Sequence, residues 1–463
     1  MLNVLEKVNA FVWGVPALLL VLGVGLYLTL RTSFAQIRLL PSAVRMFIST
    51  FTKRNNESGK VSPYRALCTA LAATVGTGNL AGVAGAIAIG GPGSIFWMWI
   101  CACLGMIIKC GEAVLAVRFR IRNHNGEYIG GPMYLIERGM GSKWRPLAMT
   151  YCFFGVVAAF GAGNATQINA MMGGINSVIS SFGGQENGWV NLTLGCLSGL
   201  LVALLLSGGA SRIGQAAERL VPFAAAVYLV LGAGVLLVCR NNIPQAFAQI
   251  FTGAFSPNAV TGGAIGSVFI VLRTGASRGV FTNEAGMGTA SIAHAGAQVR
   301  HPMEQGLMGI IEVFIDTILI CTITALVILC SGVQIRYGVD TGVTLTTAAF
   351  SAIYGQWVSV PLALILVCFA FATVLGWGLY GARCAQYIFG DGAWRKFTWI
   401  AAVTVVIGSV LDTGTVWLFS EIVNGLMTIP TLIAIAWLTP EFIKLMDDYK
   451  LFKCCTRKHM ACR

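Results

Sequence analysis

Charged residues are scarce in this chain. Asp, Glu, Lys and Arg make up only 11% of its 463 residues, and 56% of the residues are hydrophobic. Soluble globular proteins usually carry about a quarter of their residues as charged side chains. The segments 66–108, 146–185 and 341–382 contain no charge at all, and each is about twice the length that crosses a bilayer as one helix. This scarcity excludes a soluble globular protein and predicts an all-α protein with many transmembrane helices.

Histidine is also rare. The chain has four, His124, His294, His301 and His459. They do not stand at the spacing of metal ligands, and no Ser-His-Asp pattern lies among the apolar segments, so a membrane enzyme is disfavoured. The 14 cysteines lie mostly inside apolar segments, which indicates small buried hydrophobic residues and not a disulfide framework.

The C-terminal tail is the exception among the cysteines. It contains four potential metal ligands within nine residues, Cys454, Cys455, His459 and Cys462. These side chains could hold a metal ion. A basic tail beside the membrane, with incidental or lipidated cysteines, is the favoured interpretation.

The charge-poor stretches predict about eleven transmembrane helices. If the N-terminus lies outside the cell, the loops on the opposite side of the membrane hold 25 of the 31 Lys and Arg residues. Short cytoplasmic loops retain positive charge, so that side is expected to be the cytoplasm. The two longest spans are expected to be kinked or broken. The predicted spans are residues 11–30, 66–90, 93–117, 147–180, 189–207, 220–238, 260–292, 307–331, 358–380, 397–411 and 414–438.

The net charge of +13 is spread over these loops. A nucleic-acid partner would require the basic residues to form one patch, so none is expected. The first apolar stretch, residues 8–30, has no basic run before it and no clear cleavage site, which indicates a retained signal anchor. The N-terminus is therefore expected outside and the C-terminus in the cytoplasm.

The predicted spans divide into two similar halves. Residues 1–65 supply an N-terminal helix and a basic cytoplasmic segment, residues 66–238 and 260–438 hold five spans each, and residues 439–463 form a basic tail. Five is an odd number, so the two halves have opposite orientations. This is the arrangement of inverted-repeat transporters, whose binding site lies between broken helices that open the halves.

The first predicted break lies inside the span 66–90. Gly76 and Gly78 flank Thr77, and Asn79 follows directly. Each glycine costs about 1 kcal/mol in a helix relative to alanine, and unwound backbone in a membrane needs partners. Carbonyl oxygens there can bind a small cation, and N–H groups can hold a carboxylate. The alternative is that these glycines only permit close helix packing, but a mid-span Asn favours a binding site.

The second predicted break lies at residues 274–288. This segment contains four glycines together with Arg278, Asn283 and Glu284. Charges at this depth are functional candidates by default. A gating or structural role for Arg278 and Glu284, including an ion pair between them, is favoured over direct contact with a substrate.

These stretches resemble the alanine or glycine:cation symporter family of bacteria and archaea. The resemblance covers essentially the whole chain and implies a leucine-transporter-type fold with one additional N-terminal helix. It also implies sodium-coupled uptake of small neutral amino acids across a bacterial or archaeal cytoplasmic membrane. The matching segments are 73–83 (ATVGTGNLAGV), 90–93 (GGPG), 130–134 (GGPMY), 278–281 (RGVF), 283–288 (NEAGMG), 369–373 (FAFAT) and 376–377 (GW).

The resemblance also implies which residues bind the cargo. The first break would hold the substrate carboxylate, and a Trp wall would leave little room beyond a methyl side chain. The implied substrate residues are Thr77, Gly78, Asn79, Gln167, Thr373 and Trp377. The implied sodium ligands, for one ion or two, are Ala72, Thr74, Val75, Asn79 and Thr373. Alanine and glycine are implied without excluding serine or glutamine.

Further acidic residues occur at helical spacing. Glu312 and Asp316 lie four apart, and Lys109 and Glu112 lie three apart, so each pair shares a helix face. Internal ion pairs or contacts at the cytoplasmic mouth are favoured over a proton relay, because the break at 77–79 offers no carboxylate beside the substrate. A proton-coupled carrier is nevertheless the first alternative to sodium symport, and a channel is the second.

Overall fold

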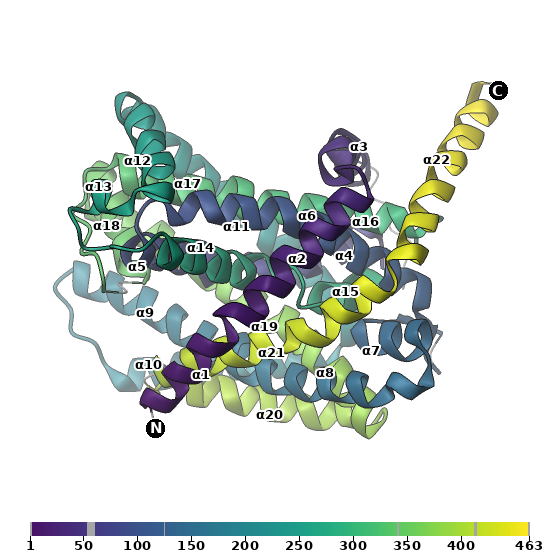
Figure 1. Ribbon diagram of the computed structural model, residues 1–463. Helices are drawn as coiled ribbons and strands as arrows, with labels where there is room; N and C mark the ends of the chain where they lie inside the picture. Colours follow the sequence, from purple (N-terminus) through teal and green to yellow (C-terminus); the bar gives the residue numbers. More distant parts are fainter. Residues whose placement is uncertain (1, 53–60, 125, 340–341, 412–413, 462–463) are drawn as a thin grey trace.

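The computed structural model describes residues 2–52, 61–124, 126–339, 342–411 and 414–461. Helices form nearly all of this part of the chain (Figure 1). The described strands form one short antiparallel hairpin of β1 (Ile121–Arg122) and β2 (Tyr128–Ile129). The all-α prediction is therefore confirmed.

The first half of the chain contains one clearly bent helix pair. Helix α4 ends at Thr74, and a π-helical turn at Gly78–Gly82 leads into α5, with a bend of 51° between the two parts. The helices up to this half's end are α1 (Leu2–Val12), α2 (Val15–Arg31), α3 (Ala35–Thr52), α4 (Pro63–Thr74), α5 (Val83–Gly90), α6 (Ser94–Phe119), α7 (Pro132–Tyr134), α8 (Arg145–Ala158), α9 (Thr166–Ser181), α10 (Gly188–Ser207) and α11 (Gly209–Val238).

The second half contains the corresponding interruption between α14 and α15. A break within the predicted segment 274–288 is confirmed, but it is confined to residues 284–288, because residues 274–283 continue the helix α14. The helices of this half are α12 (Ile243–Phe255), α13 (Pro257–Thr261), α14 (Val268–Asn283), α15 (Thr289–Ala295), α16 (Pro302–Val313), α17 (Thr322–Cys330), α18 (Val343–Tyr354), α19 (Ser359–Phe389), α20 (Ala393–Gly408), α21 (Gly414–Trp437) and α22 (Thr439–Ala461).

The described part of the chain has eight helices long and apolar enough to cross a membrane, or nine with the bent pair counted as one span. The expected count of eleven is thus not confirmed. The two remaining segments, 260–292 and 397–411, correspond to α14 with α15 and to α20. Helices α14 and α20 have 16 residues each, fewer than the roughly 20 of a full span. The expected span 147–180 lies within one helical stretch of 40 residues, with a π-helical turn at Ala159–Ala165.

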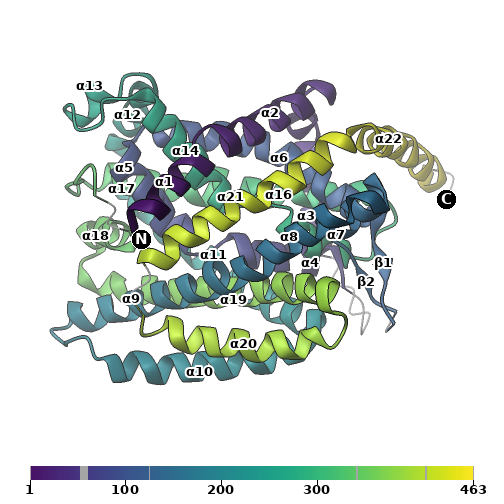
Figure 2. The same cartoon turned by 60° about the horizontal axis from the view of Figure 1, so that its bottom comes forward.

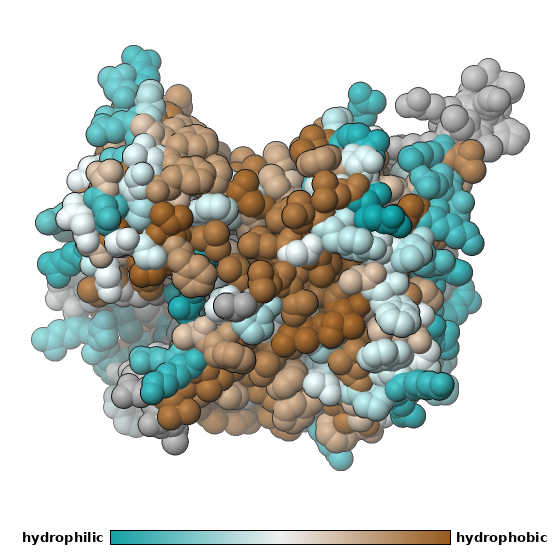
Figure 3. Space-filling view, viewed as in Figure 1, coloured by the Kyte–Doolittle hydropathy of each residue, from teal (hydrophilic) through white to brown (hydrophobic). Residues whose placement is uncertain are grey.

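The surface and the chain ends agree with a membrane protein. Figure 3 shows a hydrophobic band across the middle of one face, with hydrophilic residues at the two margins. Figures 1 and 2 place the two termini at opposite ends of the molecule, with the hairpin at the end where the C-terminus lies. Side chains of the Cys-rich tail lie outside the described residues, so its metal site stays untested.

Helix α19 brings the halves together. It is 31 residues long and packs against α4, α8, α9 and α11. A Cβ atom at Gly376 would lie 2.9 Å from the backbone nitrogen of Ala73 on α4. Small residues let helices approach this closely in membranes, and the contact places the middle of α19 beside the first break.

Candidate substrate and ion site

The first break is enclosed by protein. Gly76 lies beside α19, where an added Cβ would meet Oγ1 of Thr373 at 2.6 Å. The break leaves backbone hydrogen-bonding groups without helical partners. One of them is paired by Asn79, whose Oδ1 accepts a hydrogen bond from the Gly76 N–H at 2.9 Å. Both Thr77 and Asn79 are fully buried. The segment therefore comes apart inside the protein and not toward lipid, as unpaired backbone groups require.

A small cavity adjoins this break. It encloses about 20 Å³, whereas one water molecule needs about 10–15 Å³. Five of the six residues implied for the substrate line it, the exception being Asn79. The lining residues are Ala73, Thr74, Gly76, Thr77, Gly78, Ala162, Gln167, Phe281, Glu284, Thr373, Trp377 and Asn424. Residues from five separate helical regions thus converge on one small space.

Polar side chains of the cavity wall are held in place by hydrogen bonds. The Thr77 hydroxyl donates to Oε1 of Gln167 at 3.0 Å, and the Gln167 amide donates to the Ala162 carbonyl at 3.1 Å. The Thr373 hydroxyl donates to the Phe369 carbonyl, one turn earlier, at 3.0 Å. These bonds orient Thr77, Gln167 and Thr373 toward a common site.

Trp377 forms one wall of the cavity because a glycine faces it. A Cβ atom at Gly163 would lie 2.3 Å from Cβ of Trp377, so only glycine permits this approach. The indole is buried, and its ring makes an edge contact with that of Tyr380. The bulk of this ring limits the width of the cavity.

The residues implied for sodium are also buried around the break. Ala72, Thr74, Val75 and Thr373 supply carbonyl and hydroxyl oxygens, which suit a hard cation. Asn79 is arranged differently: its Oδ1 faces the Gly76 N–H, and its Nδ2 donates to Oδ1 of Asp316 at 2.7 Å. The donor set fits a small cation, but in this conformation the amide oxygen of Asn79 is already engaged.

The second break is held by a carboxylate of α6. Oε1 of Glu112 accepts hydrogen bonds from the N–H groups of Gly286 at 2.8 Å and Gly288 at 3.2 Å. Both glycines have positive φ values, 91° and 76°, which L side chains rarely adopt. Glu284 starts this segment with a φ of 54°, and its Oε2 accepts a hydrogen bond from the Thr289 hydroxyl at 2.5 Å.

The structure does not contain an ion pair between Arg278 and Glu284, one form of the gating or structural role that the sequence favoured. Nη1 of Arg278 instead lies 3.1 Å from Oε1 of Glu421 on α21. Residues six apart in a helix point about 120° away from each other, and the helix breaks between them. The other carboxylate oxygen of Glu421 accepts a hydrogen bond from Asn9 of α1, so Arg278 helps tie α14 to α21 and the N-terminal helix.

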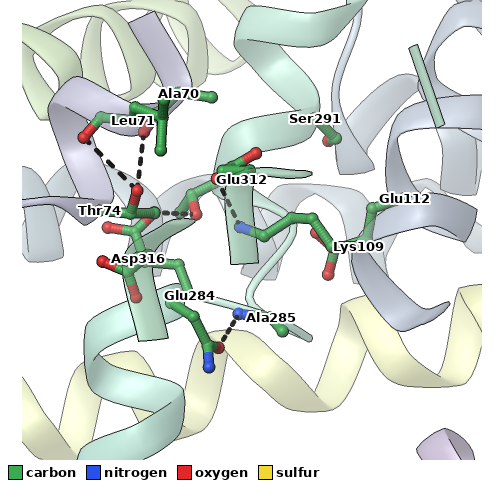
Figure 4. Close-up of polar contacts among 12 residues, drawn as sticks. Ala70, Leu71, Thr74, Lys109, Glu112, Glu284, Ala285, Ser291, Glu312 and Asp316 are labelled. Atoms are coloured by element: carbon green, nitrogen blue, oxygen red, sulfur yellow. Dashed lines mark hydrogen bonds and ion pairs between the residues drawn. The ribbon is translucent and has the colours of Figure 1, made fainter. Parts of the chain in front are cut away.

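A buried group of charges lies beside both breaks (Figure 4). Nζ of Lys109 on α6 lies 3.2 Å from Oε1 of Glu312 on α16, and Nε2 of His294 on α15 lies 2.9 Å from the other oxygen. All three side chains are fully buried. The favoured prediction of internal ion pairs is confirmed by the Lys109–Glu312 pair, which joins α6 to α16. Glu112 and Asp316, which share helix faces with these two residues, have other partners.

The expectation that no carboxylate lies beside the cavity is wrong. Glu284 lines the cavity directly. Asp316 is fully buried in the π-helical turn Phe314–Cys321 that follows α16, and it accepts hydrogen bonds from Asn79 and from Thr317. Asn424 of α21 also lines the cavity and was not predicted. The sequence signal for the two acids was their presence within apolar spans, where ionisable residues are functional candidates. Asn424 carried no comparable signal.

Comparisons with known proteins agree with this architecture. The chain is 40% identical to the sodium/alanine symporter AgcS of Methanococcus maripaludis over 94% of each chain. It is 32% identical to a putative sodium/proton-dependent alanine carrier protein, YrbD, of Bacillus subtilis, over 97% of this chain and 93% of that one. The crystal structure of MhsT in complex with L-phenylalanine superposes with a TM-score of 0.58 at 12% identity, covering 84% of this chain and 98% of that one.

The structural likeness shows the leucine-transporter-type fold, and the curated relatives are transporters and not enzymes. The model of the sodium:alanine symporter family matches residues 1–460. This chain is therefore a secondary active transporter of the sodium:alanine symporter family.

Proposed function

We propose that this protein couples the inward movement of sodium to the uptake of a small neutral amino acid, alanine or glycine, by alternating access. The observation that carries the proposal is the small cavity at the α4–α5 break, lined by Thr77, Gln167, Thr373 and Trp377. A relative 40% identical is named a sodium/alanine symporter. The Trp wall of the cavity favours a short side chain.

In this mechanism the substrate carboxylate binds at the α4–α5 break, at Thr77 and Gly78. The sodium ion binds the carbonyl oxygens of Ala72 and Val75 together with the Thr373 hydroxyl. Asn79 joins that site once its amide oxygen leaves the Gly76 N–H. The cavity must widen to admit an amino acid, since its present volume is close to that of one or two water molecules.

A second hollow supports a route to one side of the membrane. It encloses about 240 Å³ near the hairpin, and Thr69 of α4 and Leu379 of α19 line it. Ala73 and Trp377 line the small cavity at the first break. Thr69 lies one helical turn from Ala73, and Leu379 lies two residues beyond Trp377, so the two hollows are neighbours along α4 and α19. With the N-terminus outside and the C-terminus in the cytoplasm of a bacterium or archaeon, this hollow is the inward release path.

The coupling energy sets how steeply the substrate can accumulate. One positive charge moving through 100 mV supplies about 2.3 kcal/mol, equivalent to roughly 50-fold accumulation per ion. The test is uptake of labelled alanine by the purified protein in liposomes, with sodium gradients imposed or absent and with protein-free liposomes as the control. Equal uptake with and without the gradient contradicts sodium coupling.

Proton coupling is the second candidate, because Glu284 and Asp316 lie beside the cavity and the first break. In that case a pH gradient drives alanine uptake in sodium-free buffer. Uptake that follows sodium and ignores the pH gradient excludes it. Ionic current without substrate, and no accumulation against a gradient, indicates a channel instead.

A further inference from the structure

Glu284 is a carboxylate at an unusual place. It is 2% exposed, lines the cavity, and follows directly on the last residue of α14. Its N–H donates to the Val280 carbonyl, so it caps the C-terminal end of the helix. The C-terminal end of a helix dipole is negative and favours a cation. A carboxylate added at this end therefore makes the local potential more negative still.

No basic side chain forms a direct ion pair with this carboxylate in the part of the chain that the structure describes. Among the described residues, no Lys, Arg or His nitrogen lies within 4.0 Å of Glu284; the Lys109 charge acts on it from farther away and pairs directly with Glu312. The hydrogen-bond partners of its oxygens are neutral, the Thr289 hydroxyl and the Trp377 indole. A buried carboxylate whose direct partners are all neutral is stabilised further by a cation or a proton at its open side. The open side of Glu284 is the cavity.

Asn424 supplies a second acceptor in the same wall. It lies on α21, is 2% exposed, and lines the cavity together with Glu284. Its Oδ1 is buried and has no hydrogen-bond partner. Buried amide oxygens are nearly always paired, so this oxygen is available to accept a hydrogen bond from a bound ligand. Two acceptors from different helices, one of them negatively charged, thus face a space of one or two water molecules.

We propose that Glu284 and Asn424 form the binding subsite for the primary ammonium group of the substrate. A primary ammonium carries three N–H donors and one positive charge, which match a carboxylate and an unpaired amide oxygen. This subsite rests on the proposed amino-acid transport, in which Thr77 and Gly78 receive the substrate carboxylate at another wall of the cavity. Together the two walls select a zwitterion over a simple carboxylic acid.

The test compares two probes that differ only in the group in question. Binding of labelled alanine to the purified full-length protein in sodium buffer is measured in competition with unlabelled alanine and with lactate, which has a hydroxyl in place of the ammonium. The wild-type protein prefers alanine. In Glu284→Gln the affinity for alanine falls roughly tenfold to a hundredfold, lactate binding changes little, and the preference collapses.

Two further variants separate this role from a loss of folding. Asn424→Leu lowers the preference for alanine by a smaller factor, and Glu284→Asp restores part of what Glu284→Gln loses. Glu112→Gln is the matched buried control: it keeps an acceptor for the Gly286 and Gly288 N–H groups, and its affinity for alanine stays within about threefold of wild type. Binding of labelled sodium persists in Glu284→Gln.

Three results overturn the proposal. The first is a Glu284→Gln protein that keeps the wild-type preference for alanine over lactate. The second is loss of labelled sodium binding in that variant, which assigns the carboxylate to the coupling ion. The third is an Asn424→Leu protein with an unchanged preference. A wild-type protein that binds no alanine contradicts the proposed function itself, whereas normal wild-type binding with any of these three results contradicts the subsite alone.

Discussion

Replacement of Asn79 by alanine tests the first break most directly. The Asn79 side chain accepts from the Gly76 N–H at 2.9 Å and donates to Asp316, at 2.7 Å to the carboxylate and 3.1 Å to the carbonyl. Alanine leaves the Gly76 N–H without its acceptor and Asp316 without its amide donor. Each buried group left unpaired costs about 1–3 kcal/mol, so the break loses roughly 2–6 kcal/mol.

The assay is sodium-driven uptake of labelled alanine in liposomes at matched protein content. A loss of this size in the transport-competent arrangement predicts uptake below about a tenth of wild type, since 1.4 kcal/mol is a factor of ten. Asn176→Ala is the matched control, because Asn176 is a buried Asn on α9 with an unpaired oxygen and does not line the cavity. Uptake by Asn79→Ala within about twofold of wild type refutes the reasoning.

The aspartate variant gives an independent measurement at the same position. Asn79→Asp places a second carboxylate against Asp316. In the wild-type protein, Nδ2 of Asn79 lies 2.7 Å from Oδ1 of Asp316. Two carboxylates at that distance share a proton, so uptake by this variant is expected to rise as the pH falls. The wild-type pH profile is the control, and a variant profile that coincides with it contradicts the contact.

Three further substitutions have defined outcomes. Trp377→Ala removes a cavity wall, so competition by amino acids larger than alanine should strengthen; unchanged selectivity argues against its place at the substrate. Gly76→Ala puts a Cβ 2.6 Å from the Thr373 hydroxyl, and uptake should be lost while Thr373→Ser remains active; normal uptake by Gly76→Ala contradicts the close approach. Lys109→Met removes one partner of a buried ion pair and leaves Glu312 with His294, a loss that costs about 3–5 kcal/mol. Adding Glu312→Gln should restore thermal stability, and equal melting temperatures of Lys109→Met and wild type refute the ion pair.

Local features of the chain were predictable from sequence. The charge-free runs predicted a helical membrane protein, and the glycines around Thr77 and within residues 274–288 predicted two interrupted helices, both of which the structure contains. Hydrophobicity and glycine content act over a few neighbouring residues, so their effects on helix formation can be predicted from the order of residues along the chain. The number of spans was less accessible, because hydropathy does not measure how long a helix such as α20 continues.

Partnerships between distant residues depended on the tertiary structure. The sequence left an ion pair between Arg278 and Glu284 as one possibility, whereas folding places Arg278 against Glu421 of α21. Asn79 meets Asp316 across 237 residues of chain, and Asn424 reaches the cavity from a helix with no motif of its own. The sequence by itself determined where the helices run and where two of them break. Only the packing of helices decided which charges are compensated and which acceptors face the cavity, because those pairings arise between segments that are remote along the chain.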